Sequence, residues 1–423
     1  MSATDHSPDA AVVGAGPAGL MAAESLAAAG LRVVVCERMA SPARKLLMAG
    51  RGGLNLSHSE PIDRLLERYG PAADRLEPAI RTFPTEALRA WCDGLGVDTF
   101  VGSSGRVFPT RMKASPLLRA WLRRLDALGV TIRPRLTWRG FSGASGLVFD
   151  GPDGVETITP RVAVLALGGA SWPRLGADGG WTIPLTEAGV GIAPLAPANC
   201  GFTATWSPTF KARFAGSPLK RVALTFEGRT ARGEAVVTAG GIEGGLIYLF
   251  SRALRRAIER DGVARPTLDL RPDLALDALA QRMAAPRGKR SLSTHLARTA
   301  SLPPPAVALL REAGELPSDP RALAGRIKAV PLLLTGASGL DRAISTAGGV
   351  LLDEVDDDFM LKRRPATYVV GEMLDWEAPT GGYLLHACLA TGRLAGDAAA
   401  RRLAQGAGGR APILESTSRG TPS

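Results

Sequence analysis

Three glycines near the start of the chain form a turn of the kind that can bind a phosphate. Gly14, Gly16 and Gly19 give the spacing G-x-G-x-x-G. In such a turn the first glycine permits a tight bend, the second lets the backbone approach a pyrophosphate, and the third lets a helix pack on a strand. Glu37 follows at the distance, roughly 20 residues, at which an acid accepts hydrogen bonds from a ribose diol. These residues predict a dinucleotide site.

The segments around the glycines have the composition of the elements that such a site needs. Residues 10–13 are an apolar run typical of a buried parallel strand, and residues 32–36 are a second one. Between them, apolar residues recur at helical spacing, so the first N–H groups of a helix would point at the phosphates. A lone G-x-G-x-x-G also occurs in ordinary turns, but the full order strand, glycines, helix, strand and acid favours a nucleotide. Pro17 and Ala18 complete the predicted pyrophosphate site.

The net charge is +11 over 423 residues. Such an excess can indicate an anionic ligand, RNA, or a composition rich in arginine. The cations are spread along the whole chain, so we attribute the charge to composition and expect no nucleic-acid partner. The insert nevertheless contains a basic turn and a basic helix, with Arg287, Lys289, Arg290 and Arg298.

The cysteines are too far apart in sequence for a C-x-x-C or zinc motif, so we expect no metal site, and reduced thiols in a cytoplasmic protein. The first residues are polar and have no basic n-region, so no signal peptide is expected. Residues 10–23 are the longest apolar stretch, and they are too short to span a membrane. The cysteines are Cys36, Cys92, Cys200 and Cys388.

Further glycine-rich segments divide the chain. Glycines and cations alternate over residues 41–57, which suits either a loop along an anionic cofactor or a solvated surface loop. Residues 161–169 are an apolar strand that ends at Gly168 and Gly169, which suits a second close approach of backbone to the cofactor. After about residue 190 the composition shifts to alternating, strand-like segments, and near residue 345 the glycine-rich type returns. This order predicts an inserted domain.

Over residues of about 10–400, the sequence resembles the BaiN-like (YhiN-like) FAD-dependent oxidoreductases. The resemblance implies an α/β fold: a two-piece Rossmann-like FAD-binding domain with an inserted β-rich domain that contains a small helical subdomain. The predicted parts are 1–190 and 341–404 for the FAD domain, 191–340 for the insert, and 405–423 for a disordered tail. The matching segments, in order, are GAGPAG, CER, RKLLMAGRGGLNLS, GRVFP, ALGGASWPRLG, STAGGV, GEMLD and TGGY.

The resemblance also implies which residues bind FAD. The glycine turn would hold the pyrophosphate, Glu37 with the adjacent Arg38 would lie at the adenosine ribose, and Trp138 would offer its backbone to the adenine. Two further groups would lie along the cofactor and at its isoalloxazine ring. The first comprises Lys45, Arg51, Gly168, Gly371 and Glu372, and the second comprises Gly381, Gly382 and Tyr383.

Two departures from the family pattern concern the substrate side. Many relatives have arginine and cysteine where this chain has Gly53 and Leu54, so thiol chemistry at that position is lost. A frequent histidine of the insert is also missing from the segment 238–245. We therefore expect a substrate side that differs from that of many relatives.

The helix that follows Gly382 contains the two candidate catalytic residues. Its first N–H groups would stabilise the negative charge of a reduced flavin. Tyr383 could donate a hydrogen bond to a substrate oxygen or pack against the ring. His386 could act as acid or base, or could be a packed residue of the helix.

The sequence thus predicts an enzyme in which noncovalent FAD exchanges a hydride or electrons with a small organic substrate, with NAD(P)H as a candidate donor. No second G-x-G-x-x-G occurs, so a dedicated NAD(P)H domain is not expected. Two alternatives stay open: a flavoprotein that modifies RNA, and a noncatalytic redox sensor.

Overall fold

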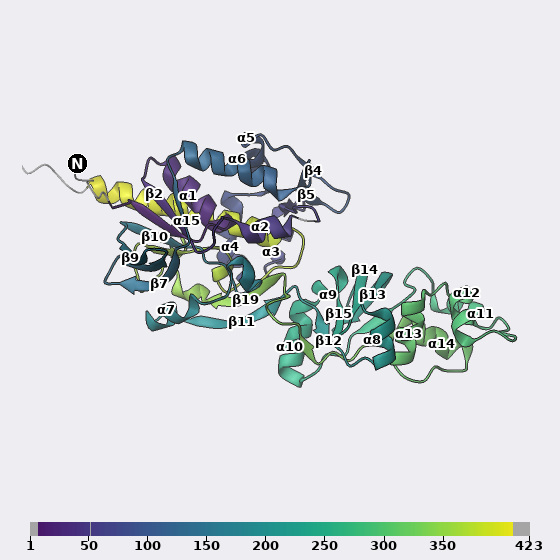
Figure 1. Ribbon diagram of the computed structural model, residues 1–423. Helices are drawn as coiled ribbons and strands as arrows, with labels where there is room; N and C mark the ends of the chain where they lie inside the picture. Colours follow the sequence, from purple (N-terminus) through teal and green to yellow (C-terminus); the bar gives the residue numbers. More distant parts are fainter. Residues whose placement is uncertain (1–6, 51, 409–423) are drawn as a thin grey trace, which may run out of the picture.

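The computed structural model describes residues 7–50 and 52–408, which form two lobes joined by a narrow neck (Figure 1). The larger lobe is built on a five-stranded sheet with the strand order β20-β10-β1-β2-β6. All of its neighbouring strands pair in parallel. Parallel strands need crossover connections, usually helices that cover the sheet, so this is the predicted Rossmann-like frame. Its strands are β1 (Ala10–Val13), β2 (Val33–Glu37), β6 (Thr131–Pro134), β10 (Val162–Leu165) and β20 (Thr367–Val369).

The edge strand β20 belongs to the part of the chain that follows the second lobe. It pairs with β10 through Ala163 opposite Thr367 and Leu165 opposite Val369. Segments before and after the second lobe therefore complete one sheet, which confirms the two-piece architecture expected from the sequence.

The first and last helices of the chain, α1 (Pro17–Ala28) and α15 (Tyr383–Gly408), pack directly on each other. A Cβ added at Gly392 would overlap the carbonyl oxygen of Ala18, and one added at Gly396 would lie 2.7 Å from the Ser25 Cβ. The two backbones approach this closely only because these α15 positions have no side chain.

The remaining elements of the larger lobe form two small antiparallel sheets and a cap of helices. The strands are β3 (Ser57–His58), β4 (Thr99–Val101), β5 (Arg106–Pro109), β7 (Thr137–Ser142), β8 (Gly146–Gly151) and β9 (Gly154–Ile158). The helices are α2 (Arg44–Ala49), α3 (Ile62–Glu67), η1 (Gly70–Ala72), α4 (Ala73–Thr82), α5 (Thr85–Gly94), α6 (Ala114–Ala127), η2 (Pro173–Leu175), α7 (Thr182–Glu187), η3 (Leu352–Glu354) and η4 (Gly371–Met373).

The neck consists of β11 (Ile192–Ala198) and β19 (Ser345–Val350), the two connections between the lobes. They pair as an antiparallel ribbon with a register shift between Ala193 and Ala196. A Cβ at Gly348 would overlap the carbonyl oxygen of Pro194, and the φ of +81° at Gly348 is itself suited to glycine. The outgoing and returning chains thus lie side by side, as Figure 1 shows.

The second lobe has a seven-stranded sheet and its own hydrophobic core, formed by residues between Cys200 and Ala343. The sheet order is β17-β16-β13-β14-β15-β12-β18, and its pairs are antiparallel. The strands are β12 (Phe202–Thr203), β13 (Pro218–Phe226), β14 (Arg229–Thr238), β15 (Gly241–Glu243), β16 (Thr267–Asp269), β17 (Val330–Pro331) and β18 (Gly336–Ala337). The helices are α8 (Pro208–Phe214), α9 (Gly245–Tyr248), α10 (Ser251–Asp261), α11 (Leu276–Met283), α12 (Leu292–Thr299), α13 (Pro304–Glu312) and α14 (Pro320–Lys328).

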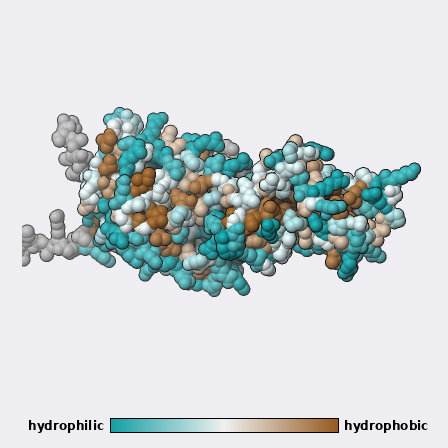
Figure 2. All heavy atoms as spheres, turned by 90° about the horizontal axis from the view of Figure 1, so that it is seen from below, coloured by the Kyte–Doolittle hydropathy of each residue, from teal (hydrophilic) through white to brown (hydrophobic). Residues whose placement is uncertain are grey.

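At the C-terminal end the structure corrects one prediction. The tail was expected to begin at residue 405, but α15 continues to Gly408, and the rest of the predicted tail lies outside the described residues. Within residues 7–50 and 52–408, no helix is both long enough and apolar enough to cross a membrane. Figure 2 shows several separate apolar patches among polar side chains on one face of the molecule.

Candidate active site

The glycine turn between β1 and α1 contains two glycines that the fold needs and one that faces open space. A Cβ at Gly14 would overlap the Ala166 carbonyl oxygen, and Gly14 has a φ of +102°. A Cβ at Gly19 would overlap the carbonyl oxygen of Gly14. A Cβ at Gly16 would meet no atom within 4 Å, and its φ of −81° suits any residue. Gly16 therefore borders open space at the amino end of α1, where the predicted pyrophosphate would lie.

The second part of the FAD domain reaches the same helix end. Gly371, with a φ of +70°, packs so closely on α1 that an added Cβ would lie 2.8 Å from the Ala18 Cβ. Its N–H donates to Thr391 Oγ1 at 3.1 Å, which fixes it to α15. The N-cap residue of α1 has no side-chain cap, so the first N–H groups of the helix stay available to an anion.

Glu37 ends β2 and is buried beside the turn. Its carboxylate accepts hydrogen bonds from the Ala15 N–H at 2.9 Å and from the Met39 N–H at 2.8 Å. Burial raises the pKa of Glu37, and these two N–H groups act in the opposite direction. Glu37 thus stabilises the glycine turn that would bind the pyrophosphate. The sequence also predicts that Glu37 binds the ribose.

The Glu37→Ala variant should bind FAD about tenfold to a hundredfold more weakly, because the ribose diol loses an acceptor worth roughly 1–3 kcal/mol. Its apoprotein should also melt at a lower temperature, since two buried N–H groups lose their partner. Titration of apoprotein with FAD, followed by flavin fluorescence, measures the affinity. The matched variant Glu37→Gln keeps one carbonyl acceptor and should show a smaller loss. Equal FAD affinity in all three proteins would place the ribose contact elsewhere.

Two other predicted residues lie near the end of β2. Arg38 forms an ion pair with Asp178 at 2.6 Å, so its charge is already shared with the 176–180 loop. The Leu136 N–H donates to the Glu37 carbonyl oxygen at 3.0 Å, which brings the strand that contains Trp138 beside the same end. The Trp138 indole is buried, and its Nε1 has no hydrogen-bond partner among the described residues. The contact of Trp138 with an adenine stays a prediction.

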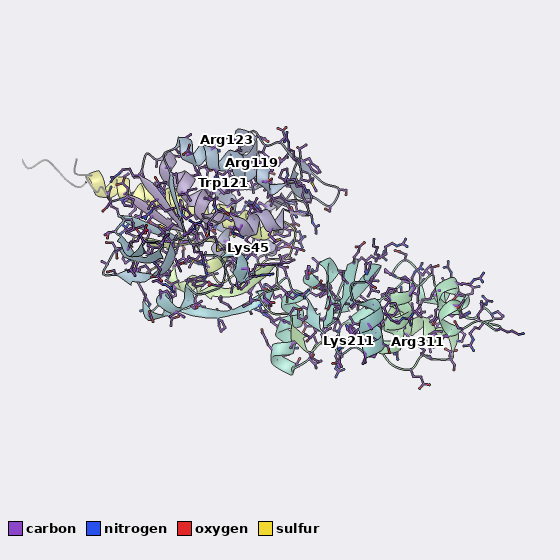
Figure 3. The ribbon with its side chains drawn as sticks, viewed as in Figure 1. Lys45, Arg119, Trp121, Arg123, Lys211 and Arg311 are labelled. Carbon is purple, nitrogen blue, oxygen red and sulfur yellow. The ribbon has the colours of Figure 1, made fainter. Side chains whose placement is uncertain are left out.

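Lys45 and Glu372, expected along the cofactor, are in contact with each other. Lys45 Nζ lies 2.7 Å from Glu372 Oε2 and 2.5 Å from Ser171 Oγ. Glu372 Oε1 accepts from the Thr346 N–H at 2.9 Å, and Figure 3 places Lys45 inside the larger lobe. This partly buried pair joins α2, β19 and η4, so both charges are balanced within the protein. Arg51, the third member of this group, lies outside the described residues.

Gly168 lies at the end of β10 and has a φ of +72°. Its carbonyl oxygen accepts from the Trp181 Nε1–H at 2.8 Å. The strand therefore ends in a turn that only glycine adopts easily, as the sequence predicts.

The amino end of α15 packs on the loop that precedes β3. Gly381 and Gly382 have φ values of +144° and +93°. A Cβ at Gly382 would lie 2.5 Å from the Ser57 nitrogen and 2.8 Å from Asn55 Oδ1. This Oδ1 is buried and has no hydrogen-bond partner in the described part of the chain. Asn55 was not predicted as a site residue. The sequence feature that could have revealed it is its polar side chain between the apolar Leu54 and Leu56, both of which are buried.

Tyr383, the first residue of α15, is buried beside a charged pair. Its hydroxyl interacts with Glu60, which is 2.6 Å from Arg68, and its ring stacks on His58 with centroids 5.6 Å apart. Burial and the hydrogen bond to Glu60 raise the pKa of Tyr383 above its usual value. The hydroxyl therefore stays protonated near neutral pH and donates its hydrogen bond to Glu60. Neither Glu60 nor Arg68 could be selected from the sequence, because no motif contains them.

The structure corrects the second catalytic candidate, His386. Its side chain has no exposed surface, Nδ1 lies 2.8 Å from Ser57 Oγ, and Nε2 lies 2.7 Å from the Phe83 carbonyl oxygen. The carbonyl can only accept, so Nε2 holds the proton and Nδ1 accepts from the serine hydroxyl. Burial lowers the pKa of His386 to about 4. Both nitrogens are thus used in packing α15, which is the packed role that the sequence left open.

We expect His386 to make stability depend on pH. Its pKa is about 4 in the folded protein against 6.5 for an ordinary histidine, so the unfolded state binds more protons between these values. Stability should therefore fall as the pH drops from 6.5 towards 4, by up to about 3 kcal/mol. Urea unfolding at pH 7 and pH 5 measures this for the protein and for His386→Gln. The variant should be less stable at pH 7 and less sensitive to pH; an unchanged slope would contradict the assignment.

The cysteines are buried, which fits the expectation that no thiol takes part. Burial raises the pKa of Cys36, Cys92 and Cys388 to about 12, and it also raises the pKa of Cys200. A thiol with such a pKa is protonated at neutral pH and is a poor nucleophile.

A parallel sheet with this glycine turn, an acid at the end of β2 and a second glycine-bounded helix end define a flavoprotein of the FAD-dependent oxidoreductase class. The chain belongs to the HI0933-like family: the model described as "HI0933-like protein Rossmann domain" matches residues 8–398. This confirms the resemblance recognised from the sequence and the FAD cofactor that it implied.

Two characterised proteins are similar over nearly their whole length. A 3-dehydro-bile acid delta(4,6)-reductase of Clostridium scindens is 27% identical over 417 residues, which cover 92% of this chain and 98% of the relative. A ribosomal RNA dihydrouridine synthase of Escherichia coli is 25% identical over 391 residues, covering 89% and 94% of the two chains. The solved structure of a 3-ketosteroid-delta4-(5alpha)-dehydrogenase from Rhodococcus jostii, with a TM-score of 0.52 and 16% identity, covers 95% of this chain and 98% of its own; it shows the shared fold.

Proposed function

We propose that this flavoprotein reduces a carbon–carbon double bond conjugated with a carbonyl group in a small organic substrate, with NAD(P)H as electron donor. The observation that carries the proposal is the group at the amino end of α15, where the Tyr383 hydroxyl lies beside the Glu60–Arg68 ion pair. Such a reduction adds a hydride to one carbon and a proton to the other, so it needs an acid beside the flavin. The two characterised relatives have names that describe the reduction of a carbon–carbon double bond.

In this proposal each protein group has a defined task. Gly16 and the start of α1 bind the pyrophosphate, and Glu37 binds the ribose. Bound FAD supplies the hydride transfer. The N–H groups at the start of α15 stabilise negative charge, and Tyr383 gives its proton to the substrate. Glu60 and Arg68 keep the Tyr383 hydroxyl in place and link it to solvent.

The second lobe would close over the flavin as a lid that excludes water and orders the substrate. It is attached through the two-stranded neck and contains no second glycine-rich nucleotide turn. NAD(P)H and the substrate would then use the same flavin face in turn.

Anaerobic steady-state kinetics with NADH or NADPH and a 3-oxo-4-ene steroid test this function. We expect parallel double-reciprocal lines, because one product leaves before the second reactant binds. Intersecting lines together with a ternary complex in direct binding would require a separate nucleotide site. Fast reoxidation by oxygen with release of peroxide, and none by the enone, would identify an oxidase instead.

Exposed cations at the tip of the second lobe favour one further candidate function, the modification of RNA by this flavoprotein. Arg287, Lys289, Arg290 and Arg298 are exposed, and the structure gives them no ion pair among the described residues. Other exposed cations lie on both lobes; Figure 3 labels Lys211 and Arg311 on the second and Arg119 and Arg123 on the larger. Incubation with NADPH and an unmodified ribosomal RNA fragment, followed by mass analysis, tests this candidate. Dihydrouridine that disappears when Lys289 and Arg290 are changed to glutamate would support it.

A further inference from the structure

A short loop joins the two groups of predicted flavin contacts in the last part of the chain. It runs from η4 to the start of α15, and residues 375–379 are its irregular middle. Its ends, Gly371 and Gly381, are among the residues that the family resemblance assigns to FAD. The Trp376 Nε1–H donates to the Gly371 carbonyl oxygen at 2.9 Å, which ties the middle to one end. Bound FAD would therefore order the whole loop.

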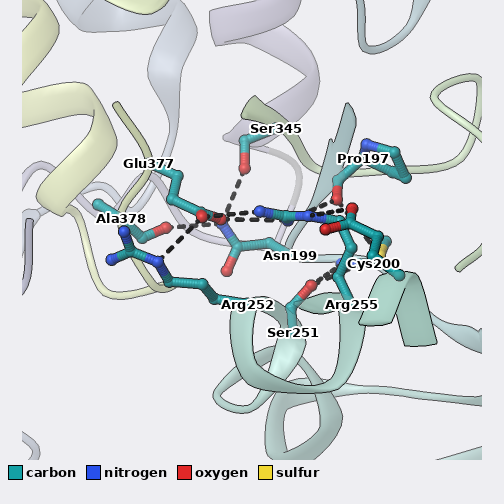
Figure 4. A network of polar contacts seen from close by, with 10 residues as sticks. Pro197, Asn199, Cys200, Ser251, Arg252, Arg255, Ser345, Glu377 and Ala378 are labelled. Carbon is teal, nitrogen blue, oxygen red and sulfur yellow. Dashed lines mark hydrogen bonds and ion pairs between the residues drawn. The ribbon is translucent and has the colours of Figure 1, made fainter. Parts of the chain in front are cut away.

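Asn199 connects this loop with the neck (Figure 4). It is buried at the end of β11, and its Nδ2 donates to the Ala378 carbonyl oxygen and to Ser345 Oγ, both at 2.8 Å. The carbonyl can only accept, which fixes the orientation of the amide. The Asp375 N–H also donates to the Val350 carbonyl oxygen at 2.8 Å. The loop is thus bonded to both strands of the neck or to their ends.

The next residue of the loop, Glu377, binds helix α10 of the second lobe. Arg255 Nη2 lies 2.8 Å from Glu377 Oε1, and Nη1 lies 3.2 Å from Oε2. The Arg252 Nε lies 3.2 Å from the same Oε1. Arg255 also donates to the Pro197 carbonyl oxygen at 3.0 Å and pairs with the exposed Glu259 at 3.5 Å. The charges are therefore balanced within the chain, and Glu377 is the acid on which two arginines of α10 converge.

These contacts link the loop to the second lobe strongly. The side chains of Arg255 and Glu377 are 10% and 13% exposed, and removal of one partner of such a pair leaves the other charge buried. A shift of the loop therefore displaces α10 as well, unless the pair breaks. If FAD orders the loop, the order extends to the second lobe, and by linkage the second lobe in turn affects the affinity for FAD.

We propose that Asn199 and Glu377 are positioning residues through which bound FAD fixes the second lobe relative to the flavin. In the apoprotein the loop loses its predicted contacts at both ends, so the second lobe moves more freely on its neck. In the holoenzyme the loop is ordered and holds α10 in place. The inference depends on the predicted FAD contacts of the loop, and it goes beyond the proposed reaction.

Hydrogen–deuterium exchange of apoprotein and FAD-loaded protein, measured by mass spectrometry, tests this without turnover. We expect FAD to slow the exchange of α10 at least tenfold in the unchanged protein. Asn199→Asp tolerates the same φ of +49° but replaces the donating amide by an oxygen. Glu377→Gln keeps the size of the side chain and loses the two-point ion pair. Each variant should reduce the effect of FAD on α10 to less than threefold.

Glu259→Gln is the matched control, because it removes an ion pair of the same Arg255 without touching the loop. It should behave as the unchanged protein. Exchange of β13, in the core of the second lobe, should be equal in all four proteins, which shows that the lobe itself stays folded. If Asn199→Asp does not meet this condition, Glu377→Gln decides the test. FAD titration should also show a threefold to tenfold weaker affinity in the two loop variants.

Three results would overturn the inference. The first is an unchanged protein in which FAD does not slow the exchange of α10. The second is protection by FAD that persists in both loop variants. The third is faster exchange by the same factor with and without FAD, which would indicate a merely structural contact. None of these measurements uses an enone, so a failure of the proposed reaction would leave the inference intact, and the reverse also holds.

Discussion

The Gly16→Val variant should lose FAD binding while its apoprotein stays folded. A Cβ at Gly16 meets no protein atom within 4 Å, and the backbone there is extended, so valine fits the apoprotein. Its side chain would instead fill the space at the amino end of α1 where the predicted pyrophosphate would lie. We expect at least a hundredfold loss in affinity, or about 2.7 kcal/mol, and a loss of less than about 1 kcal/mol in stability from the poorer helix cap.

FAD titration and thermal unfolding of the two apoproteins measure both quantities. Gly240→Val is the matched control, because Gly240 is also open to solvent but lies in a turn of the second lobe. Gly14→Ala gives the opposite case, since its φ of +102° and the overlap with Ala166 should unfold the apoprotein. Binding of FAD by Gly16→Val within about threefold of normal would move the pyrophosphate away from this turn.

Tyr383→Phe should slow reoxidation of the reduced flavin by an enone about a hundredfold, the usual lower range for loss of a general acid. The ring keeps its stacking on His58 and the backbone keeps its bond from Tyr69, so the fold should survive. Reduction of the flavin by NAD(P)H needs no proton from Tyr383 and should be unchanged.

Anaerobic stopped-flow absorbance resolves the two half-reactions of this variant. Tyr368→Phe, which removes a hydroxyl from β20 of the central sheet, is the control and should change neither step. If reoxidation of Tyr383→Phe by the enone keeps its normal rate, the proton comes from another group or from water. If both half-reactions slow together, Tyr383 positions the flavin rather than the proton.

The sequence predicted those features that depend on short, local patterns. The glycines at 14, 16 and 19 each have a steric or phosphate-binding reason that spacing alone reveals, and the structure shows a distinct environment for each. The parallel strands could be found because they are short apolar runs bounded by glycine or by an acid. The return of the chain to the first sheet followed from the change in composition near residue 345.

The parts that could not be predicted depend on contacts between distant segments. His386 has the right type and place for an acid or base, and only its contacts with Ser57 and Phe83 show that it is a packing residue. In the same way, Glu60 and Arg68 belong to no motif, and only the structure shows that they lie beside Tyr383. The role of such a side chain depends on the residues that it contacts, and these residues are distant in the sequence.

The close contact between α1 and α15 also determines the order in which the parts of this protein can fold during synthesis. The ribosome completes α1 long before α15, yet it is α15 that covers the backbone of α1 at Ala18 and Ser25, through Gly392 and Gly396. The second lobe has a self-contained core between Cys200 and Ala343, so it can fold while translation continues. Until α15 and β20 are available, the nucleotide-binding half has an uncovered apolar helix and lacks its edge strand. A chain truncated before α15 should therefore depend on chaperones and bind no flavin.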